Sequence, residues 1–225
     1  MTITDEHITY ENDCRQMFVG QVIRAVIYGE LKYYADEDGN NINPKPSYKT
    51  KYVEIDTLDH SIYFKTEDKT IYVFWDNTFI CYGLQSKQLN LTETTNDYEQ
   101  KWDVSNDIKW HEFIGQKITD FKILWKETWT SNLDGSNKIY TTYPQTFEII
   151  VENGKSIFVL ASELKDNEYE YYSQMDNLLV TTNIDLLKEL ENIEQQNIDK
   201  HNSKNSKWAK IFRQLISQLE ILKNY

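Results

Sequence analysis

Cysteine, proline and glycine are scarce in this chain of 225 residues, which contains two, three and seven of them respectively. Cys14 and Cys81 form neither a C-x-x-C pair nor a Cys/His cluster, so the sequence indicates no disulfide framework and no cysteine-based zinc site. The glycine-rich phosphate loops G-x-x-x-x-G-K-[ST] and G-x-G-x-x-G are both absent. We therefore expect no nucleotide cofactor held by such a loop.

Long apolar runs are also missing. The longest, such as Ile71–Trp75, are far too short to span a bilayer. Residues 1–16 are polar and acidic and lack the basic and apolar segments of a secretory signal. These absences predict a cytoplasmic protein that does not enter a membrane.

Basic residues are outnumbered, 24 against 36 acidic, which gives a formal net charge of −12. A surface this negative repels phosphate backbones, so direct nucleic-acid binding is disfavoured and a basic protein partner is favoured. The alternative, that the charge only keeps the protein in solution, stays open. Aromatic residues are abundant, with 16 Tyr, 9 Phe and 6 Trp, and they supply the buried area that a packed core needs.

An internal repeat is the most informative pattern in the chain. The segments Phe18–Ile23 and Phe113–Ile118 share F-[VI]-G-Q-x-I and lie 95 positions apart. Further matches follow in the same order: Glu54-Ile55 with Glu148-Ile149, Ser61–Phe64 with Ser156–Val159, and Asp76-Asn77 with Asp176-Asn177. Gly20 and Gly115 of the shared motif are expected to serve turn geometry just before a strand.

Each copy is predicted to be an antiparallel β unit. Apolar residues alternate with polar ones after each motif, most clearly at Phe121, Ile123 and Trp125, which is typical of half-buried strands. Asn153-Gly154 between alternating segments predicts a hairpin with a type I′ turn. Short strands are also expected at 71–75, 78–82 and 178–182, and 35–48 and 131–140 are expected to be loops.

The last part of the chain changes to a helical period. Residues 185–198 and 208–222 carry apolar residues at three- and four-residue spacing, which predicts two amphipathic helices. The predicted fold is therefore α+β, with two tandem divergent antiparallel β-rich repeats at 1–90 and 110–182, a linker at 91–109, and a C-terminal helical hairpin at 183–225. The hairpin is expected to pack on the sheet, with an exposed partner or dimer surface as the alternative.

No assembled catalytic group is visible. His7, His60, His111 and His201 are dispersed, and no G-x-S-x-G or H-E-x-x-H motif occurs. His60 and His111 are expected to be ordinary surface or helix-end residues, and Cys81 a buried residue of a strand. The segment 36–40 superficially resembles a calcium loop but lacks the bidentate Glu at the twelfth position. The sequence thus predicts no catalytic residue, no metal ligand and no cofactor, and favours a protein that is not an enzyme.

Two loops combine carboxylates with other contact-forming side chains. Tyrosine is a rigid amphipathic contact residue, and neighbouring carboxylates attract a basic partner. The candidate partner-binding residues are Asp36, Glu37, Asp38, Glu168, Tyr169, Glu170 and Tyr171. The alternative for both loops is a solvated connection between strands.

The second repeat carries a resemblance, in the segments "WHEFIGQKITDFKILWKETW", "YPQTFEIIVENGKSIFVLASEL" and "MDNLLV" between Trp110 and Val180. This stretch resembles a widespread type of uncharacterised bacterial protein, similar to the small immunity and accessory proteins of toxin loci. The resemblance covers about a third of the chain and supplies no catalytic residues. It implies neutralisation of a toxin by direct binding and occlusion.

Four hypotheses remain at this point. The favoured one is an acidic, immunity-like binding protein whose partner is a basic toxin domain. The second is a nucleic-acid mimic that inhibits a DNA-binding enzyme, which requires carboxylates spaced along one elongated face. The third is an enzyme of unrecognised type, and the fourth is a structural or small-ligand module.

Overall fold

The computed structural model describes residues 1–79, 82–90, 98–132, 136–165 and 170–196, with the backbone alone at 165, 170–172 and 174. The chain divides into two compact units, Met1–Ile184 and Asp185–Tyr225. The fold is α+β, with two five-stranded antiparallel sheets and helices at both ends, which confirms the predicted class.

The first sheet contains, in hydrogen-bonded order, β7 (Gly83–Leu89), β6 (Thr70–Asp76), β5 (Ser61–Lys65), β1 (Ala25–Leu31) and β8 (Glu99–Asp103). The four strands β1, β5, β6 and β7 form a meander, since each pairs with the next one along the chain within this sheet. β8 lies inside the segment 91–109 that we predicted as a linker, and it pairs with the other side of β1. The linker prediction is therefore wrong for residues 99–103.

The second sheet contains β4 (Ile55–Leu58), β12 (Glu170–Thr181), β11 (Ser156–Lys165), β10 (Ile139–Val151) and β9 (Ile118–Thr130). The last four again form a meander in chain order. The fifth strand, β4, comes from the first half of the chain and pairs with β12. The two halves are thus interlinked, because the second sheet contains a strand from the first half.

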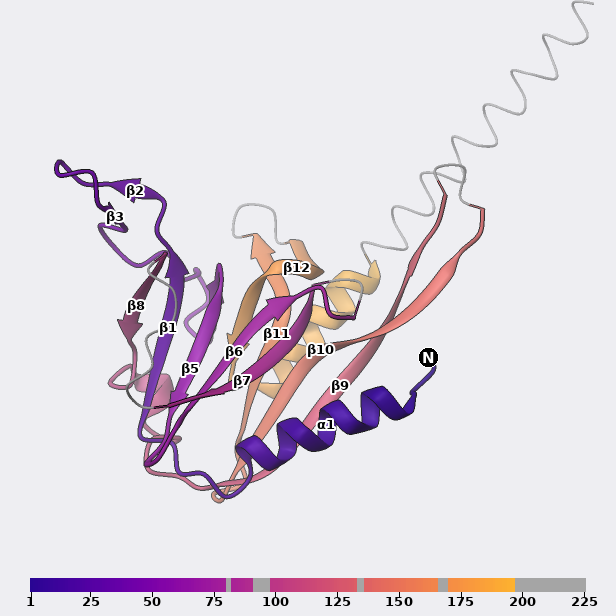
Figure 1. Cartoon of the computed structure of the whole chain (residues 1–225), viewed down its shortest axis with the longest axis horizontal. Coiled ribbons are helices and arrows are strands. Elements are labelled where there is room, and N and C mark those ends of the chain that lie inside the picture. Colours follow the sequence, from indigo (N-terminus) through magenta and orange to yellow (C-terminus); the bar gives the residue numbers. More distant parts are fainter. Residues whose placement is uncertain (80–81, 91–97, 133–135, 166–169, 197–225) are drawn as a thin grey trace, which may run out of the picture. The chain divides into compact units, whose positions relative to one another are not determined.

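One hydrophobic core joins the two sheets, because the alternating side chains of both meanders bury their apolar face in it. Its buried members from the two halves include Phe18, Val26, Phe64, Val73, Phe121, Phe147, Ile157 and Val159. Figure 1 shows the two sheets, coloured purple and orange, and α1 (Asp5–Phe18) beside β9.

Helix α1 was not expected from the sequence, because only His7, Cys14 and Phe18 of its 14 residues are buried. It begins after Thr4, whose backbone N–H donates to His7 Nδ1 at 3.2 Å. It bridges the sheets, since Tyr10 donates its hydroxyl to Leu84 O at 2.8 Å in β7 while His7 Nε2 lies 3.2 Å from Thr142 O in β10.

The two F-x-G-Q-x-I motifs bind one another. Gly20 N donates to Ile118 O and Gly115 N donates to Ile23 O, at 2.9 and 2.7 Å. Ile118 N donates to Gln21 O and Ile23 N to Gln116 O, at 2.8 and 3.0 Å. Both glycines have a positive φ, 91° and 84°, which explains why a residue without a Cβ stands there.

Three details of the sequence prediction are wrong. Ser61–Phe64 lies in β5, which pairs with the first strand of its meander, whereas Ser156–Val159 lies in β11, which does not, so these segments are not equivalent. Residues 78–79 form a turn rather than a strand, because Asp76 accepts the Thr78 N–H. The β10–β11 hairpin itself is confirmed, but its predicted type I′ turn is wrong, because Val151 N donates to Lys155 O across a three-residue loop.

The second unit is described over residues 185–196, which are helical, as the sequence predicted. The predicted second helix, 208–222, and Cys81 lie outside the described residues, and the packing of the C-terminal helices stays a prediction. Where the chain is described, no helix has the length and apolar content needed to cross a membrane.

Candidate functional site

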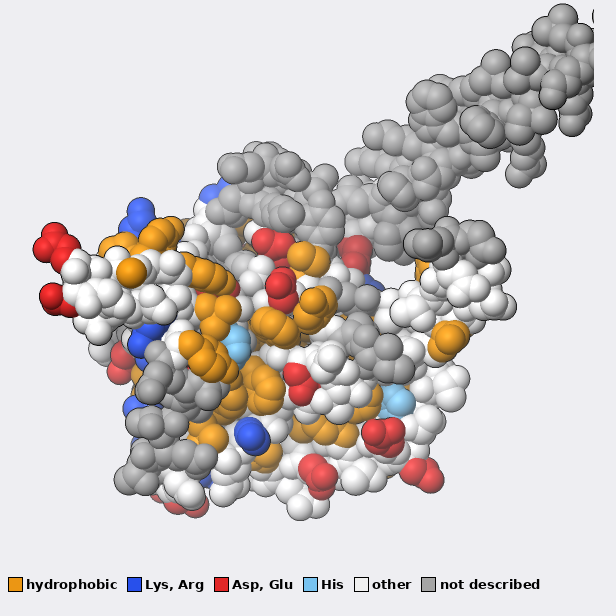
Figure 2. Space-filling view, turned by 45° about the horizontal axis from the view of Figure 1, so that its top comes forward, with side chains coloured by type: hydrophobic (Ala, Val, Ile, Leu, Met, Phe, Trp, Pro, Cys, Tyr) orange, Lys and Arg blue, Asp and Glu red, His pale blue; other side chains and the backbone are white. Residues whose placement is uncertain are grey.

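A short hairpin projects from the first sheet and carries three of the predicted contact residues. It is formed by β2 (Tyr34–Ala35) and β3 (Asn41–Ile42), and we call residues 33–42 the arm. Figure 1 shows it at the upper left, and Figure 2 shows carboxylates at its tip. The arm has the form of the hairpin loop expected from the sequence, with strands only two residues long.

Asp36 holds the tip of the arm together. Its Oδ1 accepts the N–H groups of Asp38 and Asn40, at 3.1 and 2.7 Å. Hydrogen bonds from Asn40 hold the pKa of Asp36 below its ordinary value. Glu37 and Asp38 are exposed, and within the described residues no partner accompanies their carboxylates. Two of the three predicted acidic residues are therefore presented to solvent, and the third closes the turn.

Exposed apolar side chains accompany these carboxylates. Tyr33 and Tyr34 are 64% and 62% exposed, and Ile42 is 38% exposed. At the root of the arm the buried Asn43 receives Tyr33 N–H at 3.0 Å and donates to Leu31 O at 2.5 Å. The arm is thus anchored through a satisfied buried amide, while its outer part presents tyrosine and carboxylate.

The second predicted loop is only partly described. Glu168 and Tyr169 lie outside the described residues. Glu170 and Tyr171 begin β12, opposite Lys165 and Leu164 of β11, and only their backbone is described. Their role as contact residues stays a prediction.

A buried carboxylate lies at the root of the arm. Glu99 of β8, opposite Leu31, has a side chain with no exposed area. It lies 2.5 Å from His60 Nδ1, accepts the Ser61 hydroxyl at 2.7 Å, and accepts a short hydrogen bond from the Tyr63 hydroxyl. Burial alone raises the pKa of Glu99, but these hydrogen bonds outweigh it and lower the pKa to about 2. Glu99 is therefore ionised at neutral pH although its side chain is buried.

Gly29 of β1 makes room for this cluster. A Cβ at Gly29 would collide with Ser61 Oγ and would lie 3.1 Å from both Glu99 Oε1 and the Tyr63 ring. Its φ is not in the left-handed region, so space rather than backbone conformation explains the glycine.

His60 extends the cluster toward the surface. Its side chain is 13% exposed, so the sequence-based expectation of an ordinary surface residue is wrong. The rings of Tyr72, Trp75 and Tyr98 lie 6.5, 6.0 and 5.8 Å from its ring centroid. A carboxylate at Nδ1 orients the imidazole and leaves Nε2 for another group, and Nε2 has no partner in the described part of the chain.

The cluster stabilises a buried carboxylate and does not contain an assembled nucleophile. Ser61 donates to Glu99 and not to His60, so the nucleophile–base hydrogen bond of a hydrolase triad is missing. No pattern in the sequence indicates the cluster, because His60 and Glu99 are 39 residues apart and belong to no known motif.

Asp59, next to His60, is a second perturbed carboxyl. It accepts the Leu31 N–H at 2.9 Å, at the point where β1 leads into the arm. Burial raises its pKa to about 6, and the charge of Glu30 adds to the effect. Glu30 is itself fully buried and accepts the Ser47 N–H at 3.1 Å. The root of the arm thus concentrates negative charge from both sides of β1.

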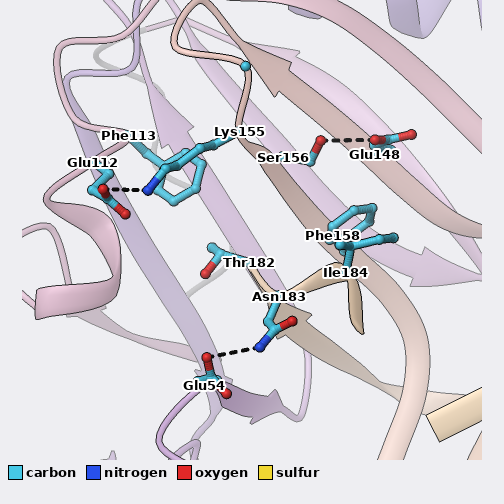
Figure 3. A pocket seen from close by; sticks show the side chains of 11 residues that line it. Glu54, Glu112, Phe113, Glu148, Lys155, Ser156, Phe158, Thr182, Asn183 and Ile184 are labelled. Carbon is cyan, nitrogen blue, oxygen red and sulfur yellow. Dashed lines mark hydrogen bonds and ion pairs between the residues drawn. The ribbon is translucent and has the colours of Figure 1, made fainter. Parts of the chain in front are cut away.

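A separate cavity of about 580 Å³ lies within Met1–Ile184, and no residue of the arm lines it. It is lined by Glu54, Glu112, Phe113, Glu148, Gly154, Lys155, Ser156, Phe158, Thr182, Asn183 and Ile184. Figure 3 shows the polar pairs Glu112–Lys155, Ser156–Glu148 and Asn183–Glu54 among its lining residues. Its size falls in the range of small-molecule sites.

Metal binding has no support in the described part of the chain, where no group of three or more His, Cys, Asp or Glu side chains could hold an ion. Comparison with protein-family models, with curated proteins and with solved structures gave no match for this chain.

Proposed function

We propose that this protein is an acidic binding protein that captures a basic protein partner through the arm, and that it acts as an immunity-like protein that occludes a toxin. The observation that carries the proposal is the arm itself, which presents Glu37 and Asp38 beside the exposed rings of Tyr33 and Tyr34. Tyrosine gives large contact area with little conformational freedom to lose, so it is common where one protein recognises another.

Charge supports the same proposal. A net charge of −12 accelerates the approach of a basic partner, and unpaired carboxylates at a projecting tip are the first groups to meet it. Binding without catalysis is supported by the cluster at the root of the arm, where Ser61 is bonded to Glu99 rather than to His60.

The test is a comparison of two charge-reversal variants of equal charge. Glu37→Lys with Asp38→Lys changes the arm, whereas Glu67→Lys with Asp68→Lys changes the exposed β5–β6 turn. Each replaces two carboxylates by two ammonium groups, so both bring the net charge from −12 to −8. With immobilised protein and a lysate of the source cells, we expect one basic protein to be retained by the wild type and by the turn variant and lost by the arm variant.

The toxin part of the proposal has its own test. The captured protein should inhibit growth when it is expressed alone, and co-expression of the wild-type chain should restore growth while the arm variant should not. Retention of the same partner by the arm variant would remove the arm from the interface. A captured partner without toxicity would leave the binding role and refute the immunity role.

We propose further that the two meanders are divergent copies of one unit. Support comes from the strand registers, since equivalent pairs recur with constant offsets within each strand. These pairs are Val26–Phe64 with Phe121–Ile149, Tyr28–Ile62 with Ile123–Phe147, and Ile62–Val73 with Phe147–Val159. The reciprocal hydrogen bonds between the two glycine motifs follow the offset of 95 as well.

A further inference from the structure

Three large apolar side chains line the 580 Å³ cavity, Phe113, Phe158 and Ile184. Phe113, from the turn that follows η1 (Ile108–Trp110), is 1% exposed, and Phe158 of β11 is 2% exposed. Ile184, at the end of the first unit, is 42% exposed and therefore gives most of the apolar surface that is open to a ligand. An apolar surface of this kind favours a ligand with a hydrocarbon body.

The rest of the cavity lining is polar and charged. Three carboxylates and a single ammonium group line the cavity, so its lining is net negative. Each carboxylate contacts one other residue of the lining, as Figure 3 shows with dashed lines. Glu54 accepts from Asn183 at 3.0 Å, Glu148 from Ser156 at 2.9 Å, and Glu112 forms an ion pair with Lys155.

These contacts fix the carboxylates without using all of their oxygen atoms. Glu54 Oε1 accepts the Asn183 bond and Glu112 Oε1 the Lys155 contact, which leaves Oε2 of each residue without a partner within the described residues. Glu148 Oε2 has only Lys122, at 3.8 Å. A carboxylate has about four acceptor positions, so each can take further donors without moving.

We propose that this cavity binds a free aliphatic di- or polyamine. Its methylene chain lies against Ile184 and the edge of Phe158, and its ammonium groups donate to Glu54 and Glu148. Ammonium groups carry only donors, and the cavity offers carboxylate acceptors together with apolar side chains, an arrangement that a neutral or anionic ligand does not match. The site is independent of the arm and does not rest on the proposed capture of a protein.

A protein of net charge −12 attracts any polycation, so the test separates the cavity from the overall charge. Spermidine is titrated by calorimetry into the full chain at 150 mM salt. Glu54→Gln with Glu148→Gln removes two charges from the cavity, and Glu37→Gln with Asp38→Asn removes two charges from the arm. We expect the cavity variant to bind at least about tenfold more weakly and the arm variant to bind within about twofold of the wild type.

A second measurement does not depend on any variant. Cadaverine should bind the wild-type chain, while 1,5-pentanediol, which has the same carbon chain without charge, should not. Equal weakening in both variants, equal binding of the diol, or no binding of spermidine would each overturn the proposal. Tighter binding of a lysine tripeptide with blocked ends than of spermidine would overturn the assignment to a free amine.

Discussion

Glu99→Gln is the substitution that probes the buried charge most directly. The amide has nearly the same shape as the carboxylate, but one of its two acceptor oxygens becomes a donor. Because the Tyr63 and Ser61 hydroxyls both donate to Glu99, and His60 Nδ1 lies within 2.5 Å, the variant places donor against donor in a site with no exposed area. We expect a large loss of stability without a change of volume.

The size of the effect follows from the pKa of Glu99, which is about 2 in the folded chain against an ordinary 4.5. A depression of that size corresponds to about 3 kcal/mol of stabilisation by the ionised form. Because the folded-state pKa lies below the unfolded value, this stabilisation is present in full above about pH 5 and is lost as the pH falls toward 2. About 1 kcal/mol of it remains at pH 3.

The assay is urea unfolding followed by tryptophan fluorescence, at pH 7 and at pH 3, since the chain has six Trp. The difference in unfolding free energy between wild type and Glu99→Gln should shrink by about 2 kcal/mol between the two pH values. Glu67→Gln is the matched control, because Glu67 is 66% exposed and its ion pair with Arg24 contributes less than about 1 kcal/mol. An equal difference for Glu99→Gln at both pH values would refute the reasoning.

Two further substitutions test the packing around the same sheets. Gly29→Ala should destabilise the chain by about 2 kcal/mol in urea unfolding, because the added Cβ collides with Ser61. Adding Ser61→Ala should recover part of this loss, and an unchanged stability in Gly29→Ala would show that the sheet adapts. Lys109→Met should lower the free energy of unfolding by about 3 kcal/mol at pH 7, because Lys109 Nζ lies 2.5 Å from Asp56 and both side chains are about nine-tenths buried. A loss below about 1 kcal/mol would mean that the Asp56 carboxylate does not need the lysine.

The strands that the sequence predicted well are those with a strict period of two. In β9, Phe121 and Ile123 are buried while Lys122 is exposed, and this alternation is visible without a structure. Gly20 and Gly115 were also interpreted correctly as turn residues, because a positive φ is a local property.

Features that depend on distant partners were missed. β8 contains Gln100, Lys101 and Asp103 and has no apolar period, so only its pairing with β1 makes it a strand. β4 follows the F-x-G-Q-x-I motif of the first half along the chain, yet it is a strand of the second sheet. The intrinsic strand propensity of its residues does not indicate which sheet it joins. Helix α1 places Tyr10, Cys14, Met17 and Phe18 at helical spacing against the core, but the many polar residues between them obscured this period. The helix also makes polar contacts, among them the Ile123 N–H donating to Glu11 at 3.4 Å.

The candidate site likewise has one part that the sequence predicted and one part that it did not. The acidic tip at 36–38 was found because Asp, Gly and Asn in a short polar run predict a projecting turn, and such turns carry exposed charge. The Glu99 cluster was not found, because its members come from β5, β8 and the turn between β4 and β5 and share no spacing. A buried charge is assembled by tertiary pairing, so the sequence shows its components without their proximity.

The buried cluster and the arm are connected through β8. Gln100, the residue after Glu99, accepts the Asn43 N–H at 2.5 Å and donates to Asn43 O at 2.9 Å, so β8 holds the strand that returns from the arm. The hydrogen bonds of Glu99 link β8 to β5 and to the turn before it, and Gln100 links β8 to the base of the arm. A binding surface held in place before contact loses less conformational entropy on association. Under the proposed function, the hydrogen bonds of Glu99 therefore add to the affinity for a partner, because they help to hold the arm in place before contact.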